Sequence, residues 1–172
     1  MRDGRYVFDL SKLARYHAEN LLSFKQSLAR GTDLVVVDNT NIHPWETEPY
    51  TAAARAAGSR IVFLNFAPRA LELHLAAQQV TPEKPDAHEV PEDALREHIE
   101  EFHRYNDLLE PGVKPDLARH PNYQWDDLLQ DVVPTAQPCP PFDFDDVIQI
   151  SPQTYHQEKE RIGSRILALL GT

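Results

Sequence analysis

Cysteine is almost absent from this chain, which holds one, Cys139, among its 172 residues. A disulfide-stapled scaffold and a zinc site made of cysteine thiolates are therefore both excluded for this sequence. Long apolar runs are lacking as well, and none approaches the roughly 20 residues of a membrane-spanning helix. The first residues carry no apolar stretch typical of a signal peptide. We therefore expect a cytoplasmic protein without a membrane partner.

Glycine and basic residues are also scarce. None of the 6 glycines clusters with another, and the phosphate-binding pattern Gly-x-x-x-x-Gly-Lys-[Ser/Thr] does not occur. The 17 Lys and Arg against 27 Asp and Glu leave a net charge of −10. Such acidity argues against non-specific binding along a nucleic-acid backbone. A nucleotide or a nucleic-acid end needs only a few local cations, so the acidity excludes neither as a partner.

What the chain does contain is an alternation of helical and strand patterns. Helical spacing of apolar residues runs from 11 to 30, and the β-branched run 34–37 is typical of a buried strand. A helix opening at Pro44 and ending near Gly58 precedes a second buried strand at 61–64. The order helix, strand, helix, strand is that of a parallel α/β sheet.

The rest of the chain extends this pattern. We expect helices from about 71 to 79 and 92 to 109, a strand at 146–150, and a helix that starts at Ser151-Pro152. We interpret about 110–141 as an irregular excursion held down by its apolar side chains, Tyr123, Trp125, Leu128 and Leu129. The fold expected is one α/β domain over 1–172, a three-layer parallel sheet with flanking helices.

Polar residues of the kind that bind ligands gather directly after the first predicted strand, as Asp38-Asn39-Thr40-Asn41. In open α/β sheets, ligands bind beyond the carboxyl ends of the strands. A carboxylate there can hold a hydrated magnesium ion, and the amides and hydroxyl can bind phosphate or sugar oxygens. The alternative is that these residues only turn the chain and cap the helix at Pro44.

A family resemblance begins at these residues. The run Val36–Asn41, followed by Trp45-Glu46 and Pro49-Tyr50, resembles the second half of the polynucleotide-kinase-like, AAA-type ATP-binding branch of P-loop kinases. The element His88–Pro91 is similar to a short His-x-Val-Pro segment of that branch. The resemblance covers roughly 6–109 and implies a P-loop NTPase-like fold.

The resemblance also implies cofactors and roles. Members use ATP and magnesium, so Asp38 would lie near the metal. The substrate-binding residues would be Asn39, Thr40 and Asn41, on the acceptor side. The segment of about 69–91 would be a lid over the transferring phosphate, and its candidate residues are Arg69, Lys84 and His88.

The chain departs from this family in two ways. It lacks the first strand, the P-loop, the first helix and the catalytic aspartate, so no catalytic residue is assigned here. Residues 2–9 resemble the segment directly after that aspartate, which makes Met1 an internal methionine of a truncated kinase in our interpretation. The lid is also poor in arginine, and lysine does not replace arginine at a bidentate phosphate site.

Three functions remain open. The first is an ATP-dependent kinase acting on a nucleotide, a nucleic-acid end or a small hydroxyl substrate, inactive without its P-loop. The second is a degenerate, non-catalytic binding or regulatory module. The third is a hydrolase using Asp38 and histidines. Trp45 and Tyr50 could stack on a base, although packing of helix on sheet is the commoner use. Glu100-x-x-His103 has the spacing of half a metal site, but the sequence offers no second copy of this pair, so a solvated helix face is the better interpretation.

Overall fold

The computed structural model describes residues 10–79, 90–109, 114, 117, 120–126, 128–153 and 155–171. The chain divides into two compact units. The first combines Met1–Asp38 with Arg69–Ile99, and the second combines Asn39–Pro68 with Glu100–Thr172. None of the helices in the described ranges is long and apolar enough to cross a bilayer.

The first unit is helical where it is described. A 3-10 turn, η1 (Leu10–Lys12), leads into α1 (Leu13–Ala29), and the unit also holds α3 (Leu71–Ala77) and the start of α4 (Glu92–Asn106). Gly31, two residues after the end of α1, has φ of 70°, a conformation that favours glycine. These helices confirm the sequence prediction. α1 buries Phe24, and the leucines of the same stripe, Leu13, Leu21 and Leu28, are half-buried.

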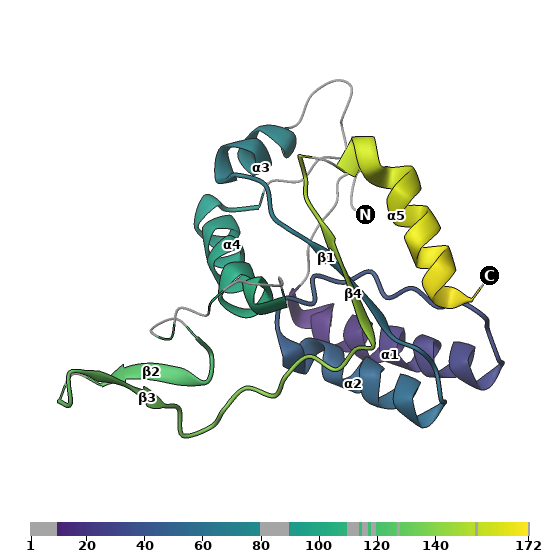
Figure 1. Cartoon of the computed structure of the whole chain (residues 1–172), viewed down its shortest axis with the longest axis horizontal. Coiled ribbons are helices and arrows are strands. Elements are labelled where there is room, and N and C mark those ends of the chain that lie inside the picture. The colour runs from purple at the N-terminus through teal and green to yellow at the C-terminus, as the bar shows by residue number, and fades with distance from the viewer. Residues whose placement is uncertain are drawn as a thin grey trace. The chain divides into compact units, whose positions relative to one another are not determined.

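The second unit contains the parallel strands. It holds α2 (Pro44–Ala56), β1 (Val62–Phe66), β4 (Asp146–Ile150) and α5 (Tyr155–Leu170), with α4 ending in a 3-10 turn, η2 (Asp107–Leu109). β1 and β4 pair in parallel, from Val62 opposite Asp146 to Phe66 opposite Ile150. Figure 1 shows the two strands side by side, as predicted for 61–64 and 146–150.

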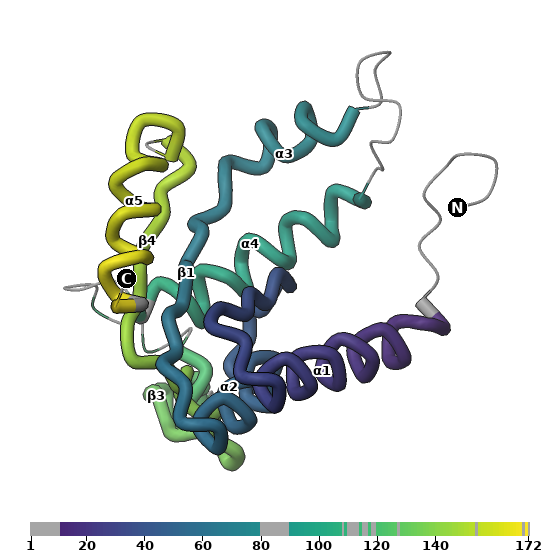
Figure 2. The backbone as a smooth tube through the Cα atoms, turned by 90° about the vertical axis from the view of Figure 1, so that its right-hand side faces the viewer, coloured from purple at the N-terminus to yellow at the C-terminus, as the bar shows by residue number. Residues whose placement is uncertain are grey.

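The core of this unit lies between α5 and one face of the β1–β4 pair (Figure 2). Ile148 and Ile150 of β4 and Ile162 of α5 are buried, at 1%, 3% and 8% exposure. Apolar residues at alternate strand positions and on one stripe of α5 point to the same interior. The partly buried side chains packed around them are Val62, Leu64, Ile166 and Leu169.

The opposite strand face carries a different set of contacts. Phe63 packs against Phe142 and Phe144, with ring centroids 5.2 and 5.7 Å apart. Beyond them, Asn65 Nδ2 donates a hydrogen bond of 2.7 Å to Gln149 Oε1, and Asn65 is only 3% exposed. The amide pair satisfies part of the hydrogen-bonding capacity that a buried polar side chain must meet.

A separate antiparallel hairpin occupies part of the segment that we expected to be irregular. β2 (Tyr123–Asp126) pairs with β3 (Asp131–Pro134). The expectation that apolar side chains hold this segment down is wrong for three of the four residues, whereas Tyr123 is half-buried and its ring contacts His120. Trp125 is 50% exposed, Leu128 92% and Leu129 64%.

The predicted three-layer parallel sheet is wrong. The described residues form two sheets of two strands each, β1–β4 and β2–β3. The expected strand at 34–37 has no ladder partner in the described part of the chain, and Leu34 and Val36 are 53% and 72% exposed. A β-branched run favours extended backbone. Pairing into a sheet needs a neighbouring strand, which the run itself does not specify.

Candidate functional site

The predicted substrate-binding residues form the connection that enters α2. Asn39 is half-buried, and its Nδ2 lies 3.4 Å from Tyr50 Oη on that helix. Thr40 and the preceding Asp38 are exposed. Asn41 has φ of 45°, in the left-handed region where asparagine is one of the few tolerated residues. Asn41 thus turns the chain, whereas the residue that caps α2 is His43. Ligand binding by Asn39, Thr40 and Asn41 stays a prediction.

A buried amide fixes this connection to α4. Asn106 Nδ2 donates a 2.8 Å hydrogen bond to the Ile42 carbonyl, and Asn106 is 1% exposed. A buried amide is costly unless it is hydrogen-bonded. The bond therefore specifies which residue of the loop meets the end of α4, and it positions the next residue, His43.

His43 lies between two carboxylates. Its Nε2 is 3.1 Å from Glu101 Oε2 on α4, and its Nδ1 is 3.3 Å from Glu46 Oε2 on α2. The Glu46 carboxylate also accepts the His43 backbone N–H at 2.9 Å, as in a helix capping box. Contacts on both ring nitrogens fix the orientation of the imidazole between α2 and α4.

An aromatic group completes the site. The Trp45 indole stacks on the His43 ring, with centroids 4.3 Å apart and planes 12° from parallel. The Tyr105 ring meets both edge-on, at 4.9 and 5.4 Å. Tyr105 is 9% exposed and burial raises the pKa of its phenol, whereas Trp45 is 46% exposed. We call His43, Trp45, Glu46, Glu101 and Tyr105 the His43 cluster.

Sequence reasoning named Trp45 as a stacking candidate and Glu46 only as part of the family resemblance, and it missed His43, Glu101 and Tyr105. The spacing His43-x-x-Glu46 has the form of a capping box with histidine in place of serine or threonine. Glu101 and Tyr105 lie four residues apart, and so on one helix face. Each spacing can be recognised in the sequence, but neither shows that the start of α2 contacts α4. The contact spans 58 positions between His43 and Glu101.

The predicted lid is described at its two ends only. Arg69 is exposed, and its backbone N–H donates to His74 Nε2 at 3.2 Å. Gln78, just after α3, makes two hydrogen bonds to the Val90 backbone, of 2.8 and 2.9 Å, within the first unit. Lys84 and His88 lie outside the described residues. The roles of all three candidate lid residues stay predictions.

Metal binding by Asp38 also stays a prediction. No group of three or more histidine, cysteine, aspartate or glutamate side chains in the described ranges is placed to hold a metal ion. His103, of the Glu100-x-x-His103 pair, instead contacts Asp107 one turn on, at 2.9 Å.

The single cysteine is not activated as a nucleophile. Burial raises the pKa of the Cys139 thiol, which disfavours the nucleophilic thiolate.

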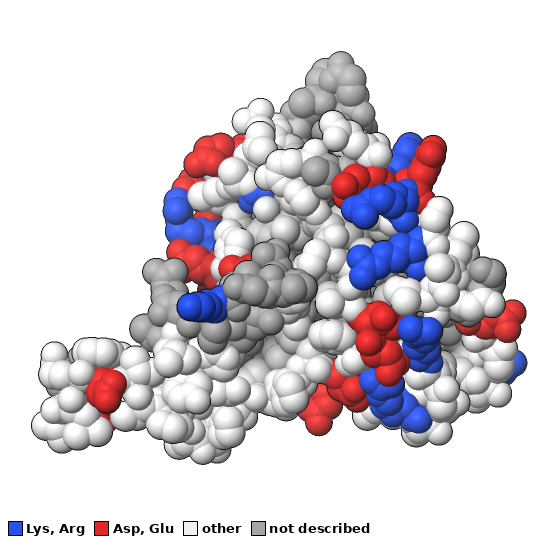
Figure 3. Space-filling model, viewed as in Figure 1, with Lys and Arg blue, Asp and Glu red and all other residues white. Residues whose placement is uncertain are grey.

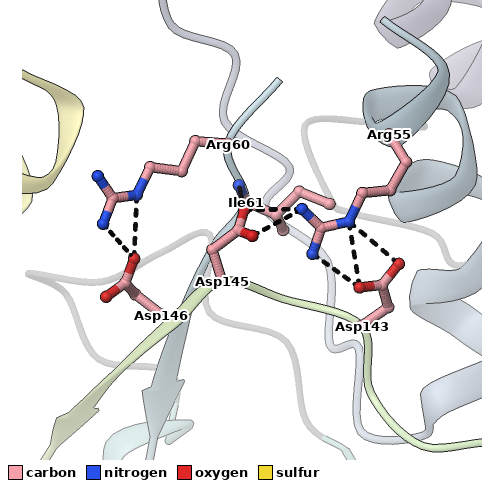
Figure 4. A network of polar contacts seen from close by, with 6 residues as sticks. All are labelled: Arg55, Arg60, Ile61, Asp143, Asp145 and Asp146. Carbon is pink, nitrogen blue, oxygen red and sulfur yellow. Dashed lines mark hydrogen bonds and ion pairs between the residues drawn. The ribbon is translucent and has the colours of Figure 1, made fainter. Parts of the chain in front are cut away.

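A second polar network lies at the amino ends of β1 and β4 (Figure 4). Arg55 of α2 contacts Asp143 and Asp145 at 2.7 Å each, and Arg60 contacts Asp146 at 2.7 Å. Asp145 also accepts the Ile61 backbone N–H at 2.7 Å. Ligands of parallel sheets bind at the carboxyl ends of the strands, the opposite ends from this network. Its charges are paired with one another, which favours a structural role.

Comparison with known proteins assigns no family. No family model matches the chain, and no solved structure matches it. It is similar to human NEDD4-binding protein 2, with 30% identity over 61 residues. That match covers 36% of this chain and 3% of the human protein.

Proposed function

We propose that the His43 cluster and the Asn39–Asn41 loop bind a nucleotide or a related hydroxyl-bearing molecule, and that the chain acts as a non-catalytic binding module. The half-exposed indole of Trp45 carries this proposal. An indole held on one side by His43 and Tyr105 and open to solvent over nearly half its surface can stack on a planar ligand. Stacking a base on an aromatic side chain contributes about 1–3 kcal/mol.

The loop before the cluster supplies the groups that would hold a sugar. Thr40 is exposed and offers a hydroxyl, which both donates and accepts hydrogen bonds. The side-chain amides of Asn39 and Asn41 are half-buried on the same short connection. The resemblance to polynucleotide-kinase-like proteins assigns the same three residues to the acceptor. The polar groups of this loop and the family resemblance thus both support a ligand that carries sugar hydroxyls.

The charge around the cluster favours the nucleoside part of the ligand over its phosphates. Glu46 and Glu101 both face the His43 ring. Arg104 beside them is paired with Glu101 at 3.7 Å and lies over the Tyr105 ring. A phosphate placed close to the two carboxylates would still meet more negative than positive charge. The sequence also lacks a phosphate-binding loop of the Gly-x-x-x-x-Gly-Lys-[Ser/Thr] type. Binding therefore depends mainly on stacking and hydrogen bonds and should be nearly independent of salt.

Phosphotransfer is the second candidate, and the exposed Asp38 at the start of the same loop favours it. Magnesium is commonly held by one or two carboxylates together with substrate phosphates. Asp38 would supply such a carboxylate, with ATP and the ion bringing the other ligands. In this case the same loop would hold the phosphate acceptor.

Tryptophan fluorescence tests the proposal directly, because the chain has two tryptophans. In a Trp125→Phe variant, Trp45 is the sole reporter, and titration with adenosine, guanosine, cytidine or uridine should quench it with saturation. Trp45→Leu in the wild-type background should weaken binding measured by calorimetry about tenfold, as expected for a lost stacking contact.

Three results decide between the candidates. Saturable nucleoside binding with no labelled phosphate transferred from ATP-magnesium supports the non-catalytic module. Transfer to an oligonucleotide 5′ end that Asp38→Asn abolishes supports the phosphotransferase. Absence of quenching by all four nucleosides and their triphosphates contradicts the proposal.

A further inference from the structure

The tip of the β2–β3 hairpin displays large apolar side chains. Three of them occur within five residues: Trp125 is 50% exposed, Leu128 92% and Leu129 64%. Isolated exposed apolar residues are ordinary, but a group of large ones on one short element marks an interaction site. We call Trp125, Leu128 and Leu129 the apolar tip.

The turn that carries the apolar tip is fixed by a side chain. The Asp126 carboxylate accepts the backbone N–H groups of Leu128 and Leu129, both at 2.9 Å. Two such bonds restrain the backbone of Leu128 and Leu129, as aspartate commonly does in turns. A surface that is ordered before binding loses less conformational entropy when a partner binds. The two leucines are thus displayed on a preformed turn.

The charge of the hairpin is of one sign. Asp126 and Asp131 lie directly opposite each other at the end of the ladder, where like charges are unfavourable. The sequence has no lysine or arginine between Arg119 and Lys159. On the face shown in Figure 3, the hairpin carries red and no blue. A cation brought to the tip from outside would relieve this repulsion.

We propose that the apolar tip docks into an apolar groove rimmed by lysine or arginine on another protein. The leucines would fill the groove while Asp126 and Asp131 meet its basic rim. A second copy of this chain is disfavoured, because two acidic hairpins on chains of net charge −10 would repel each other. Nucleic acid and anionic membrane are disfavoured on the same electrostatic ground. This proposal does not depend on the ligand of the His43 cluster.

Photo-cross-linking of the full chain identifies what covers the tip. A photoreactive phenylalanine analogue replaces Leu128, and the control places it at Leu22 of α1, which is 57% exposed. After irradiation in the chain's native cells, mass spectrometry should identify a protein captured from position 128 and not from position 22. The cross-linked peptide of that protein should contain apolar residues beside lysine or arginine.

The captured protein is then purified and its affinity is measured by calorimetry. The double variant Leu128→Ser, Leu129→Ser should bind about tenfold more weakly or worse, as for residues at the centre of an interface. Asp126→Asn with Asp131→Asn keeps the side-chain oxygens that accept the turn hydrogen bonds. It should weaken binding about two- to fivefold and reduce its salt dependence. Unchanged circular dichroism confirms that the variants fold.

Several outcomes overturn the proposal. The first is that the photoreactive group at position 128 captures no more of any protein than the same group at position 22. A captured surface without basic residues, or an affinity that the serine variant leaves unchanged, would do the same. Dimerisation of the chain itself, seen by sedimentation equilibrium and lost in the serine variant, would show that the occupant is a second copy.

Discussion

At the scale of single residues, His43 matters because it connects parts of the chain that are distant in sequence. Its ring contacts Glu46 one turn on in α2 and Glu101 on α4, and it supports the Trp45 indole from one side. The Asn106 side chain donates a hydrogen bond to the carbonyl of Ile42, the residue directly before His43. The orientation of Trp45 therefore depends on the His43 ring as well as on its edge-on contact with Tyr105.

Replacing His43 tests this dependence. In the Trp125→Phe background, His43→Ala removes the ring that stacks on Trp45, and we expect lower fluorescence anisotropy and weaker nucleoside binding. The lost aromatic pair should also lower the free energy of unfolding by about 0.5–1.5 kcal/mol, measured by urea denaturation. Glu101→Gln is the matched control, because it keeps a side-chain oxygen near His43 and should leave the anisotropy nearly unchanged. Equal anisotropy in wild type and His43→Ala would refute the dependence.

At the scale of elements, ion pairs of two arginines with three carboxylates join the amino ends of β1 and β4. These side chains, which we call the Arg55 network, are Arg55, Arg60, Asp143, Asp145 and Asp146. The Arg55 guanidinium lowers the pKa of the Asp143 carboxyl through its hydrogen bond. The pKa of Asp145 is lowered first by the Ile61 backbone N–H and then by Arg55. A carboxyl whose pKa is lower in the folded state stabilises that state above its unfolded pKa, about 3.9 for aspartate.

This linkage gives a pH prediction for the network. Its contribution to stability should be fully present at neutral pH, and it should be lost as the pH falls below about 4 through the folded pKa values. Both carboxylates are exposed, so the effect should be modest. The melting temperature of Asp143→Asn with Asp145→Asn should be lower than that of wild type at pH 7, with the difference shrinking towards pH 3. A difference that grows on acidification would contradict the assignment.

Local patterns predicted most elements of this chain because helix periodicity and capping signals are local. The helices over 11–30, 44–58 and 92–109 and the strands at 61–64 and 146–150 all correspond to observed elements. Pairing is not local, which is why the strand expected at 34–37 is wrong. The same limit applies to the His43 cluster, whose two halves are recognisable separately but not as one site.

At the scale of the whole molecule, buried apolar surface is limited. Within the described ranges, the buried apolar side chains are Phe24, Ala54, Tyr105, Ile148, Ile150 and Ile162. Thirteen large apolar residues of the same ranges are exposed. Burial of apolar area is the dominant favourable contribution to folding. A core of this size should therefore leave little net stability.

Urea denaturation of the full chain, followed by far-ultraviolet circular dichroism, measures this stability. We expect a free energy of unfolding below the about 5–15 kcal/mol typical of native proteins. Ile148→Ala removes the most buried apolar side chain and should cost about 2–5 kcal/mol, so that much of the variant is unfolded without denaturant. Ile148→Val should cost only about 0.5–1.5 kcal/mol, and Leu129→Ser, at an exposed site, should cost almost nothing. An Ile148→Ala variant as stable as Leu129→Ser would show that the β4–α5 core does not limit the stability of this chain.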